Sequence, residues 1–178
     1  MPSSFDPYDA LPAVASFDVR SDDVSDGTTL SMPQVSGIFG SGGEDRSPHL
    51  AWSGAPDGTA SYAVTCLDPD APTGSGFWHW VAYDIPASVA ELAAGAGDRE
   101  GSGLPAGAKQ LRNDAGLHGY LGASPPIGHG PHRYMFVVHA LDVAELPIGA
   151  DATPAFCTFN LFGTTLARAR VTPVYEQQ

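Results

Sequence analysis

The sequence has few of the features that nucleic-acid-binding and membrane-bound proteins need. Only 8 of its 178 residues are basic, against 20 acidic residues, and the formal net charge is −12. Lys109 is the single lysine, and the arginines form no cluster. A field of this sign repels nucleic acid and anionic membrane surfaces. We therefore expect no nucleic-acid partner, and we interpret the acidity as a source of solubility.

Long apolar runs and cysteines are also scarce. No run approaches the roughly 20 apolar residues of a membrane-spanning helix, so we expect no stable membrane insertion. The first residues carry neither the basic nor the apolar region of a signal peptide. The two cysteines, Cys66 and Cys157, lie far apart in apolar surroundings, which favours buried free thiols over a disulfide. Together these features predict a cytoplasmic protein.

A long helical period is missing as well, whereas glycine (21) and proline (16) are abundant. This composition favours short strands joined by many turns, and the length suits one domain. We expect a single domain over residues 1–178 that begins with an extended arm, residues 1–15. The expected strands share short apolar or alternating patterns and lie at 17–19, 33–39, 49–52, 61–67, 78–85, 133–141 and after Val171.

Two helices are expected beside these strands. The pair Ser88 and Glu91 has the spacing of a capping box, and the next glycine, Gly95, can end the short helix that follows. Thr153 and the proline after it suit the N-cap and N1 positions of a C-terminal helix, which we expect to reach about Arg168.

Two stretches place hydrogen-bonding side chains at the ends of apolar strands. The first, DPDAPTGSGFWHWVAYD, spans 68–84, and the second, PPIGHGPHRYMFVVHALD, spans 125–142. Alternate residues of a strand share a face. His132 and Tyr134 are therefore expected to point to one side together. The same rule predicts that His79 shares its face with the residues two and four positions further on, and that the two flanking tryptophans point the other way.

These side chains suit a small anion. Imidazole and phenol groups donate hydrogen bonds to phosphate or carboxylate, and turns rich in glycine expose further N–H groups. Asp68 can fix a histidine tautomer or stabilise a protonated imidazole. Other interpretations stay open. Most Asp-Pro pairs are only turns, His129 and His132 lack a third metal ligand, and no G-x-S-x-G elbow marks a nucleophile. We expect no metal and no cofactor.

Taken together, the two stretches resemble the two signatures of the phosphatidylethanolamine-binding protein family. DPDAP, a glycine-containing loop and HW match the first signature, and PPIGHGPHRY matches the second. SPHLAWSGAP (47–56), FWHWVAYDIP (77–86) and NDAGLHGYLG (113–122) are similar to the bacterial branch, the Raf kinase inhibitor-like proteins, and above all to its actinobacterial members. The resemblance covers residues 17–175, nearly the whole chain.

The resemblance implies a mainly β fold. This is a large antiparallel β-sandwich with one short helix after the second signature strand (78–85) and one C-terminal helix. It also implies a small surface cavity and a cis peptide bond at Ala71–Pro72. The implied ligand-binding residues are Asp68, Pro72, His79, Ser124, Pro126, His132 and Tyr134. Two departures affect the rim: ASPP replaces a cysteine-containing segment of many bacterial relatives, and no covering helix is evident after Val171.

The resemblance implies non-enzymatic binding of a small anionic ligand, such as phosphate, a carboxylate or a phospholipid headgroup like that of phosphatidylethanolamine. Two alternatives stay open. One is a regulatory module that binds a kinase or protease partner through the pocket, and the other is a weak hydrolase that uses the Asp–His pair and a bound water. The aromatic residues Phe77, Trp78 and Trp80 are a candidate face for a homodimer.

Overall fold

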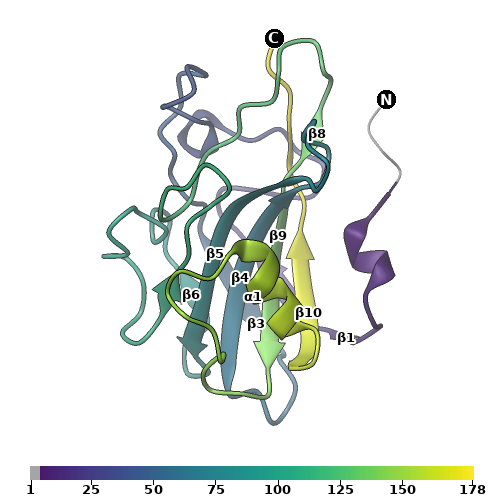
Figure 1. The fold of residues 1–178 in the computed structure, drawn as a ribbon, viewed down its shortest axis with the longest axis vertical. Coiled ribbons are helices and arrows are strands. Elements are labelled where there is room, and N and C mark those ends of the chain that lie inside the picture. Colours follow the sequence, from purple (N-terminus) through teal and green to yellow (C-terminus); the bar gives the residue numbers. More distant parts are fainter. Residues whose placement is uncertain (1–4) are drawn as a thin grey trace.

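A six-stranded sheet forms the centre of the computed structural model, which describes residues 5–178 (Figure 1). Its strand order is β1-β10-β9-β4-β5-β7, and all neighbours are antiparallel except β1 and β10. The strands of this sheet are β1 (Ala15–Ser16), β4 (Ser61–Asp68), β5 (Phe77–Pro86), β7 (Lys109–Gln110), β9 (Met135–Leu141) and β10 (Thr165–Val171). The remaining elements are η1 (Pro7–Ala10), β2 (Asp18–Arg20), η2 (Met32–Gln34), β3 (Leu50–Ser53), β6 (Glu91–Leu92), β8 (His132–Arg133), α1 (Pro154–Leu161) and β11 (Val174–Tyr175).

Two apolar cores lie on the two faces of this sheet. Successive side chains of a strand point to opposite faces, so the long strands supply both cores. On one face, Val64 and Phe136 belong to the same core as Trp52 of β3 and Leu92 of β6, and the small sheet β2-β3-β6 closes a sandwich. On the other face, α1 buries Cys157 against β4, β5 and β9 (Figure 1). Both cysteines are buried free thiols, as predicted.

Most of the predicted strands are confirmed, and the mainly β fold with them. The expected segments at 49–52, 61–67, 78–85 and 133–141 correspond to β3, β4, β5 and β8 with β9, and the last segment is β11. The segment 33–39 is not a strand. Pro33 lies in the first turn of η2, and beyond it only Val35 forms an isolated bridge, with Ala123. A proline cannot donate a hydrogen bond to a neighbouring strand, so the apolar pattern of these residues does not produce a strand.

The helix predictions need two corrections. No helix follows β5: residues 87–95 form turns and the short strand β6, because Leu92 is buried in the sandwich core opposite Leu50 of β3. The C-terminal helix begins as predicted, with the Thr153 hydroxyl accepting from the Phe156 N–H, but it ends at Leu161. From Thr165 to Val171 buried side chains alternate with partly or fully exposed ones, and these residues join the sheet as β10. Their burial repeats every two residues, as in a strand, and not every 3.6 as in a helix.

The N-terminal arm is not extended throughout. Residues 1–4 of the predicted arm lie outside the described residues. From Pro7 to Ala10 the chain forms the 3₁₀ turn η1, capped by the Asp6 carboxylate, which accepts from the Tyr8 N–H at 2.9 Å. The arm then pairs with β10 through β1. Over residues 5–178, no helix combines the length and apolar character needed to cross a membrane.

Candidate functional site

A cavity of about 180 Å³ opens where β4 ends and β5 and β8 begin. The two predicted stretches meet here although they are far apart in the sequence, and the rim segment at 122–126 leads into the second of them. All seven residues that the resemblance implied line this cavity: Asp68, Pro72, His79, Ser124, Pro126, His132 and Tyr134. Their role in binding a ligand stays a prediction. Six further residues complete the wall, and none of them was predicted as a ligand-binding residue: Phe39, Ala71, Thr73, Phe77, Gly122 and Pro125.

His79 reaches the cavity because β5 contains a β-bulge at its start. Cys66 pairs with Trp80, but the next residue of β4, Leu67, pairs with Trp78, so His79 is an extra residue in β5. A bulge places two successive side chains on one face. His79 therefore lies on the sandwich side together with Trp80, while Trp78 packs against the helix-side core.

Two predictions from simple strand alternation are therefore wrong. His79 does not share a face with Val81 and Tyr83, which lie in the helix-side core. Trp80 does not point away from His79, and it is fully buried in the sandwich core. Since Trp80 has no exposed surface, it cannot form part of the candidate homodimer face. A homodimer itself stays a prediction.

Asp68 and His132 form a buried pair at the centre of the cavity wall. The Asp68 Oδ2 atom lies 2.7 Å from His132 Nδ1, and the two residues are 3% and 1% exposed. A carboxylate only accepts hydrogen bonds, so Nδ1 carries a proton and donates it. The other carboxylate oxygen accepts from the Asp70 N–H at 2.8 Å. Asp68 therefore fixes both the orientation and the tautomer of His132.

His129 extends this pair into a chain of three residues. Its Nδ1 lies 2.6 Å from His132 Nε2. In a neutral His132 the Nδ1–H points at Asp68, so Nε2 accepts and His129 donates. The two imidazole rings meet edge to face, with centroids 4.9 Å apart. The i, i+3 spacing of the two histidines was noticed in the sequence, but it was weighed only as a metal site. Within residues 5–178 no group of three or more metal-ligating residues is arranged to hold an ion.

His79 is held by its backbone partner and by aromatic rings. Its Nδ1 lies 2.7 Å from the Leu121 carbonyl oxygen, which can only accept, so Nδ1 carries the proton. The ring lies against Phe77 and edge to face with Tyr134, at centroid distances of 4.8 and 5.1 Å. Burial lowers the pKa of His79, although the Leu121 carbonyl and the charge of Asp68 oppose this shift. The ring is neutral near pH 7.

Tyr134 contributes a hydroxyl group that has no hydrogen-bond partner among residues 5–178. The residue is fully buried and lines the cavity, and its Oη atom is itself buried. Burial, and then the negative charge of Asp68, raise the pKa of Tyr134 far above its ordinary value. The hydroxyl group therefore stays protonated and is an available donor. Buried polar groups are nearly always paired, so this one calls for an acceptor that the protein does not supply.

An ion pair holds the Asp-Pro turn against β8. The Asp70 carboxylate accepts from Arg133 Nε and from its terminal nitrogen, each at 2.8 Å, and from the Arg133 backbone N–H at 3.0 Å. Burial alone would raise the pKa of Asp70, but these hydrogen bonds and the charge of Arg133 lower it. The expected cis bond at Ala71–Pro72 is wrong, since residues 5–178 contain no cis peptide bond.

The rim of the cavity is joined to two distant segments. Ser124 Oγ lies 2.7 Å from Ser41 Oγ, and the Gly122 N–H donates to the Asp45 carboxylate at 2.8 Å. The segment after Val171 forms β11 and pairs with β8 beside the cavity, so it is a strand and not a covering helix. Residues 172–178, the part of the chain after Val171 that the structure describes, contain no helix.

Comparison with known proteins identifies relatives over most of the chain. Residues 20–176 match the family model described as phosphatidylethanolamine-binding protein. The UPF0098 protein YbcL of Escherichia coli (strain K12) is 47% identical over 162 residues, which cover 91% of this chain and 88% of the relative. The UPF0098 protein YbhB of the same organism is 46% identical over 159 residues, covering 88% and 98%.

Further comparisons extend the match to structure and to a mycobacterial protein. The crystal structure of E. coli YbcL, described as a new member of the mammalian PEBP family, superposes with a TM-score of 0.89 at 46% identity and covers 92% of this chain and all of that one. The putative lipoprotein LppC of Mycobacterium tuberculosis (strain ATCC 25618 / H37Rv) is 34% identical over 145 residues, covering 81% and 65%.

Proposed function

This chain belongs to the phosphatidylethanolamine-binding protein family, and we propose that it binds a small anionic ligand in the Asp68–His132 cavity without catalysing a reaction. The unpartnered hydroxyl group of Tyr134 carries the proposal. A buried donor at the wall of a small cavity gains a hydrogen bond when an oxyanion enters. His79 can add a second bond once it is protonated, because an anion opposes the effect of burial on its pKa.

Asp68 does not prevent anion binding in this arrangement. Its two oxygen atoms already accept hydrogen bonds from His132 and from the Asp70 N–H, so the negative charge is stabilised by groups of the cavity wall. The role of Asp68 is to hold the His132 ring in a fixed orientation beside the ligand.

The exposed side chains around the mouth favour an anion that carries an apolar part. Phe39 lines the cavity and is 54% exposed, and Ile127, which follows the rim residue Pro126, is 72% exposed. Free phosphate would leave both in water. A phospholipid such as phosphatidylethanolamine, with its headgroup in the cavity, would cover them.

The arrangement of hydroxyl and thiol groups supports binding and argues against catalysis. Ser124 Oγ, on the cavity wall, contacts Ser41 and no histidine. Cys66 lies behind the wall, and burial raises its pKa well above the ordinary value. A nucleophile needs a base within hydrogen-bond reach, and among the described contacts neither Ser124 nor Cys66 hydrogen-bonds to a histidine or a carboxylate. Incubation with phosphate and carboxyl esters should give no turnover above that of buffer.

Calorimetry with O-phosphorylethanolamine and with inorganic phosphate tests the proposal. We expect saturable binding that weakens at least tenfold in His132→Ala and in Asp68→Ala, since each change removes or disorders the central imidazole. His118→Ala is the matched control, because His118 lies at a different surface hollow. Equal affinities in all four proteins would refute the proposal. Titration with phosphatidylethanolamine vesicles then separates a lipid headgroup from a free phosphate compound.

A further inference from the structure

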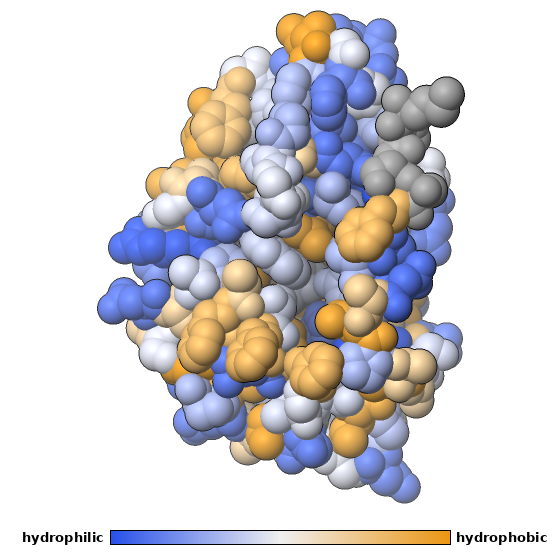
Figure 2. All heavy atoms as spheres, turned by 45° about the vertical axis from the view of Figure 1, so that its right-hand side comes forward, coloured by the Kyte–Doolittle hydropathy of each residue, from blue (hydrophilic) through white to orange (hydrophobic). Residues whose placement is uncertain are grey.

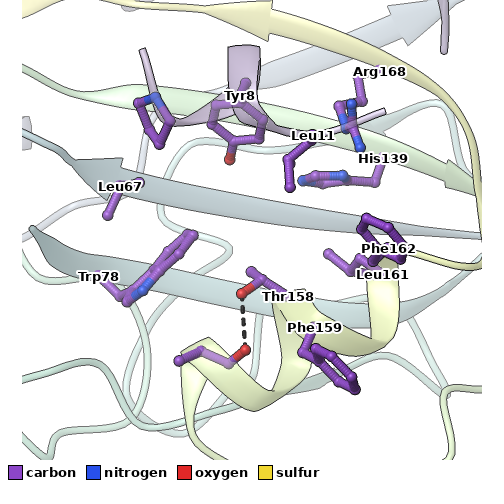
Figure 3. Close-up of a pocket in the computed structure, with 12 residues that line it drawn as sticks. Tyr8, Leu11, Leu67, Trp78, His139, Thr158, Phe159, Leu161, Phe162 and Arg168 are labelled. Carbon is purple, nitrogen blue, oxygen red and sulfur yellow. Dashed lines mark hydrogen bonds between the residues drawn. The ribbon is translucent and has the colours of Figure 1, made fainter. Parts of the chain in front are cut away.

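A second cavity, of about 310 Å³, lies on the helix side of the sheet, between η1, the strands and α1 (Figure 3). Its walls are mainly apolar and aromatic: Tyr8, Leu11, Leu67, Trp78, Leu161 and Phe162. It shares no lining residue with the first cavity. Leu67 and Trp78 face this cavity, whereas their neighbours Asp68 and His79 face the other, so the same two strands build both.

The surface around this cavity is unusually apolar. Phe156 and Phe159 of α1 and Phe162, which follows the helix, are 51%, 73% and 56% exposed, and Leu11 of the arm is 37% exposed. Figure 2 shows hydrophobic side chains gathered on this face on both sides of a hollow. An apolar cleft of this volume lies at the lower end of the range of small-molecule sites, roughly 300–1,000 Å³.

Two nitrogen atoms of cavity-lining residues are buried without any hydrogen-bond partner in the described part of the chain. They are His139 Nδ1 and Arg168 Nε. His139 is 3% exposed, and Figure 3 shows the Arg168 side chain beside its ring. Arg168 uses one terminal nitrogen to donate to the Pro12 carbonyl at 3.2 Å. Two unpaired polar atoms at one end of an apolar cavity are a rare combination.

The hydrogen-bond chain behind His139 indicates that His139 Nδ1 is a donor, as Arg168 Nε always is. Tyr8 Oη lies 3.3 Å from Thr65 Oγ1, which lies 3.2 Å from His139 Nε2. Burial raises the pKa of Tyr8 to about 12 and, with the charge of Arg168, lowers that of His139 to about 3. Near pH 7 the phenol is therefore protonated and the imidazole is neutral.

Only one direction of this chain uses both hydroxyl protons. Tyr8 donates to Thr65, and Thr65 donates to His139 Nε2. In the reverse direction the Tyr8 proton would have no acceptor among the contacts of residues 5–178. Nε2 is then the acceptor of the neutral ring, so Nδ1 carries the proton. His139 and Arg168, which both line the cavity, therefore each carry a buried N–H group without a partner.

We propose that this second cavity binds a small organic carboxylate with an aromatic body, with the carboxylate group against Arg168 and His139. A carboxylate supplies two acceptor oxygens and the charge that complements the guanidinium group. The ring of the ligand packs between Trp78, Leu11 and Phe162. Inorganic phosphate matches the donors but leaves the apolar walls unfilled, so it belongs in the first cavity.

Calorimetry with 3-phenylpropionate and its alcohol, 3-phenylpropan-1-ol, tests this proposal. We expect saturable binding of the acid and binding of the alcohol at least tenfold weaker, because a hydrogen bond to a charged group contributes about 1.5–3 kcal/mol. Arg168→Met, which keeps an apolar side chain of similar length, should weaken acid binding about tenfold. Arg20→Met is the matched control, since the Arg20 side chain is 70% exposed, and it should change nothing.

The comparison of acid with alcohol needs no variant, so the proposal can be refuted even if Arg168→Met folds poorly. Equal affinities of acid and alcohol, or no saturable binding of the acid, would overturn it. Competition by inorganic phosphate, or loss of binding in His132→Ala, would also overturn it by assigning the acid to the first cavity. Those last two results would leave the proposed function standing, so the two failures are distinguishable.

Discussion

Replacing Tyr134 with phenylalanine should raise the stability of the ligand-free protein and weaken its binding of anions. Tyr134 Oη is buried without a partner, and an unsatisfied buried hydroxyl costs about 1–3 kcal/mol. Phenylalanine removes that group and keeps the ring that packs against His79 at 5.1 Å. Allowing for the small space left behind, we expect the free energy of unfolding to stay equal or to rise by about 1 kcal/mol.

Binding should change in the opposite direction. A hydrogen bond between the Tyr134 hydroxyl and an oxyanion contributes about 1.5–3 kcal/mol, so Tyr134→Phe should bind phosphate about 10- to 100-fold more weakly. Urea denaturation in phosphate-free buffer measures the first effect, and calorimetry with inorganic phosphate at pH 7 measures the second. A gain in stability combined with a loss of affinity is typical of a group held unpaired for a ligand.

Tyr120→Phe is the matched control. Tyr120 is also buried in the sandwich core, at 1% exposure, but its hydroxyl group donates to the Gln34 carbonyl at 2.8 Å. Its loss removes this hydrogen bond, while the Gln34 carbonyl keeps the one from the Ala123 N–H at 3.2 Å, and should destabilise the protein by about 0.5–1.5 kcal/mol without changing phosphate affinity. If Tyr134→Phe behaves like Tyr120→Phe, losing stability and keeping its affinity, the reasoning about the cavity is wrong.

Two further predictions concern stability. The folded-state pKa of His139, about 3, lies below its ordinary value of 6.5, so the unfolded chain takes up a proton first as pH falls. Urea titrations should therefore show wild type losing about 2 kcal/mol more than His139→Gln between pH 6.5 and 4.5, and parallel curves would contradict this. Gly122→Ala should lower the melting temperature by several degrees, because its Cβ would lie 2.3 Å from the Val35 carbonyl carbon. Overpacking of this kind typically costs about 1–3 kcal/mol. Gly74→Ala is the control and should leave the melting temperature unchanged, since the space around Gly74 is open.

The long strands were predictable because their own residues determine them. Residues 61–67 and 133–141 are apolar over a length typical of buried strands, and they form β4, β8 and β9. Thr153 also marked the start of α1 correctly. The end of α1 was not predictable from the helical pattern, because residues 165–171 pair with β9 in the sheet instead of extending the helix. Leu92 likewise joins a strand, β6, because its side chain fills the sandwich core.

The membership of the candidate site was predictable, whereas its geometry was not. The two signature stretches named six of the seven lining residues, and the seventh, Ser124, directly precedes the second stretch. They could not show that His79 occupies a β-bulge, since the extra residue appears only when β5 is aligned with β4. His129 was missed for a similar reason. Its contact with His132 depends on the path of the glycine-rich turn between them, which no periodic pattern encodes.

The two ends of the six-stranded sheet have a consequence for association between molecules. An exposed strand edge is a template for pairing with another chain. Here β10 is bordered by β1 and β5 by β7, and each border strand has only two residues. Further along β5, the Asp114 and Leu121 N–H groups donate to the carbonyls of Trp78 and His79. The four long strands thus offer little free edge, which protects a strand-rich protein from growth into aggregated sheets.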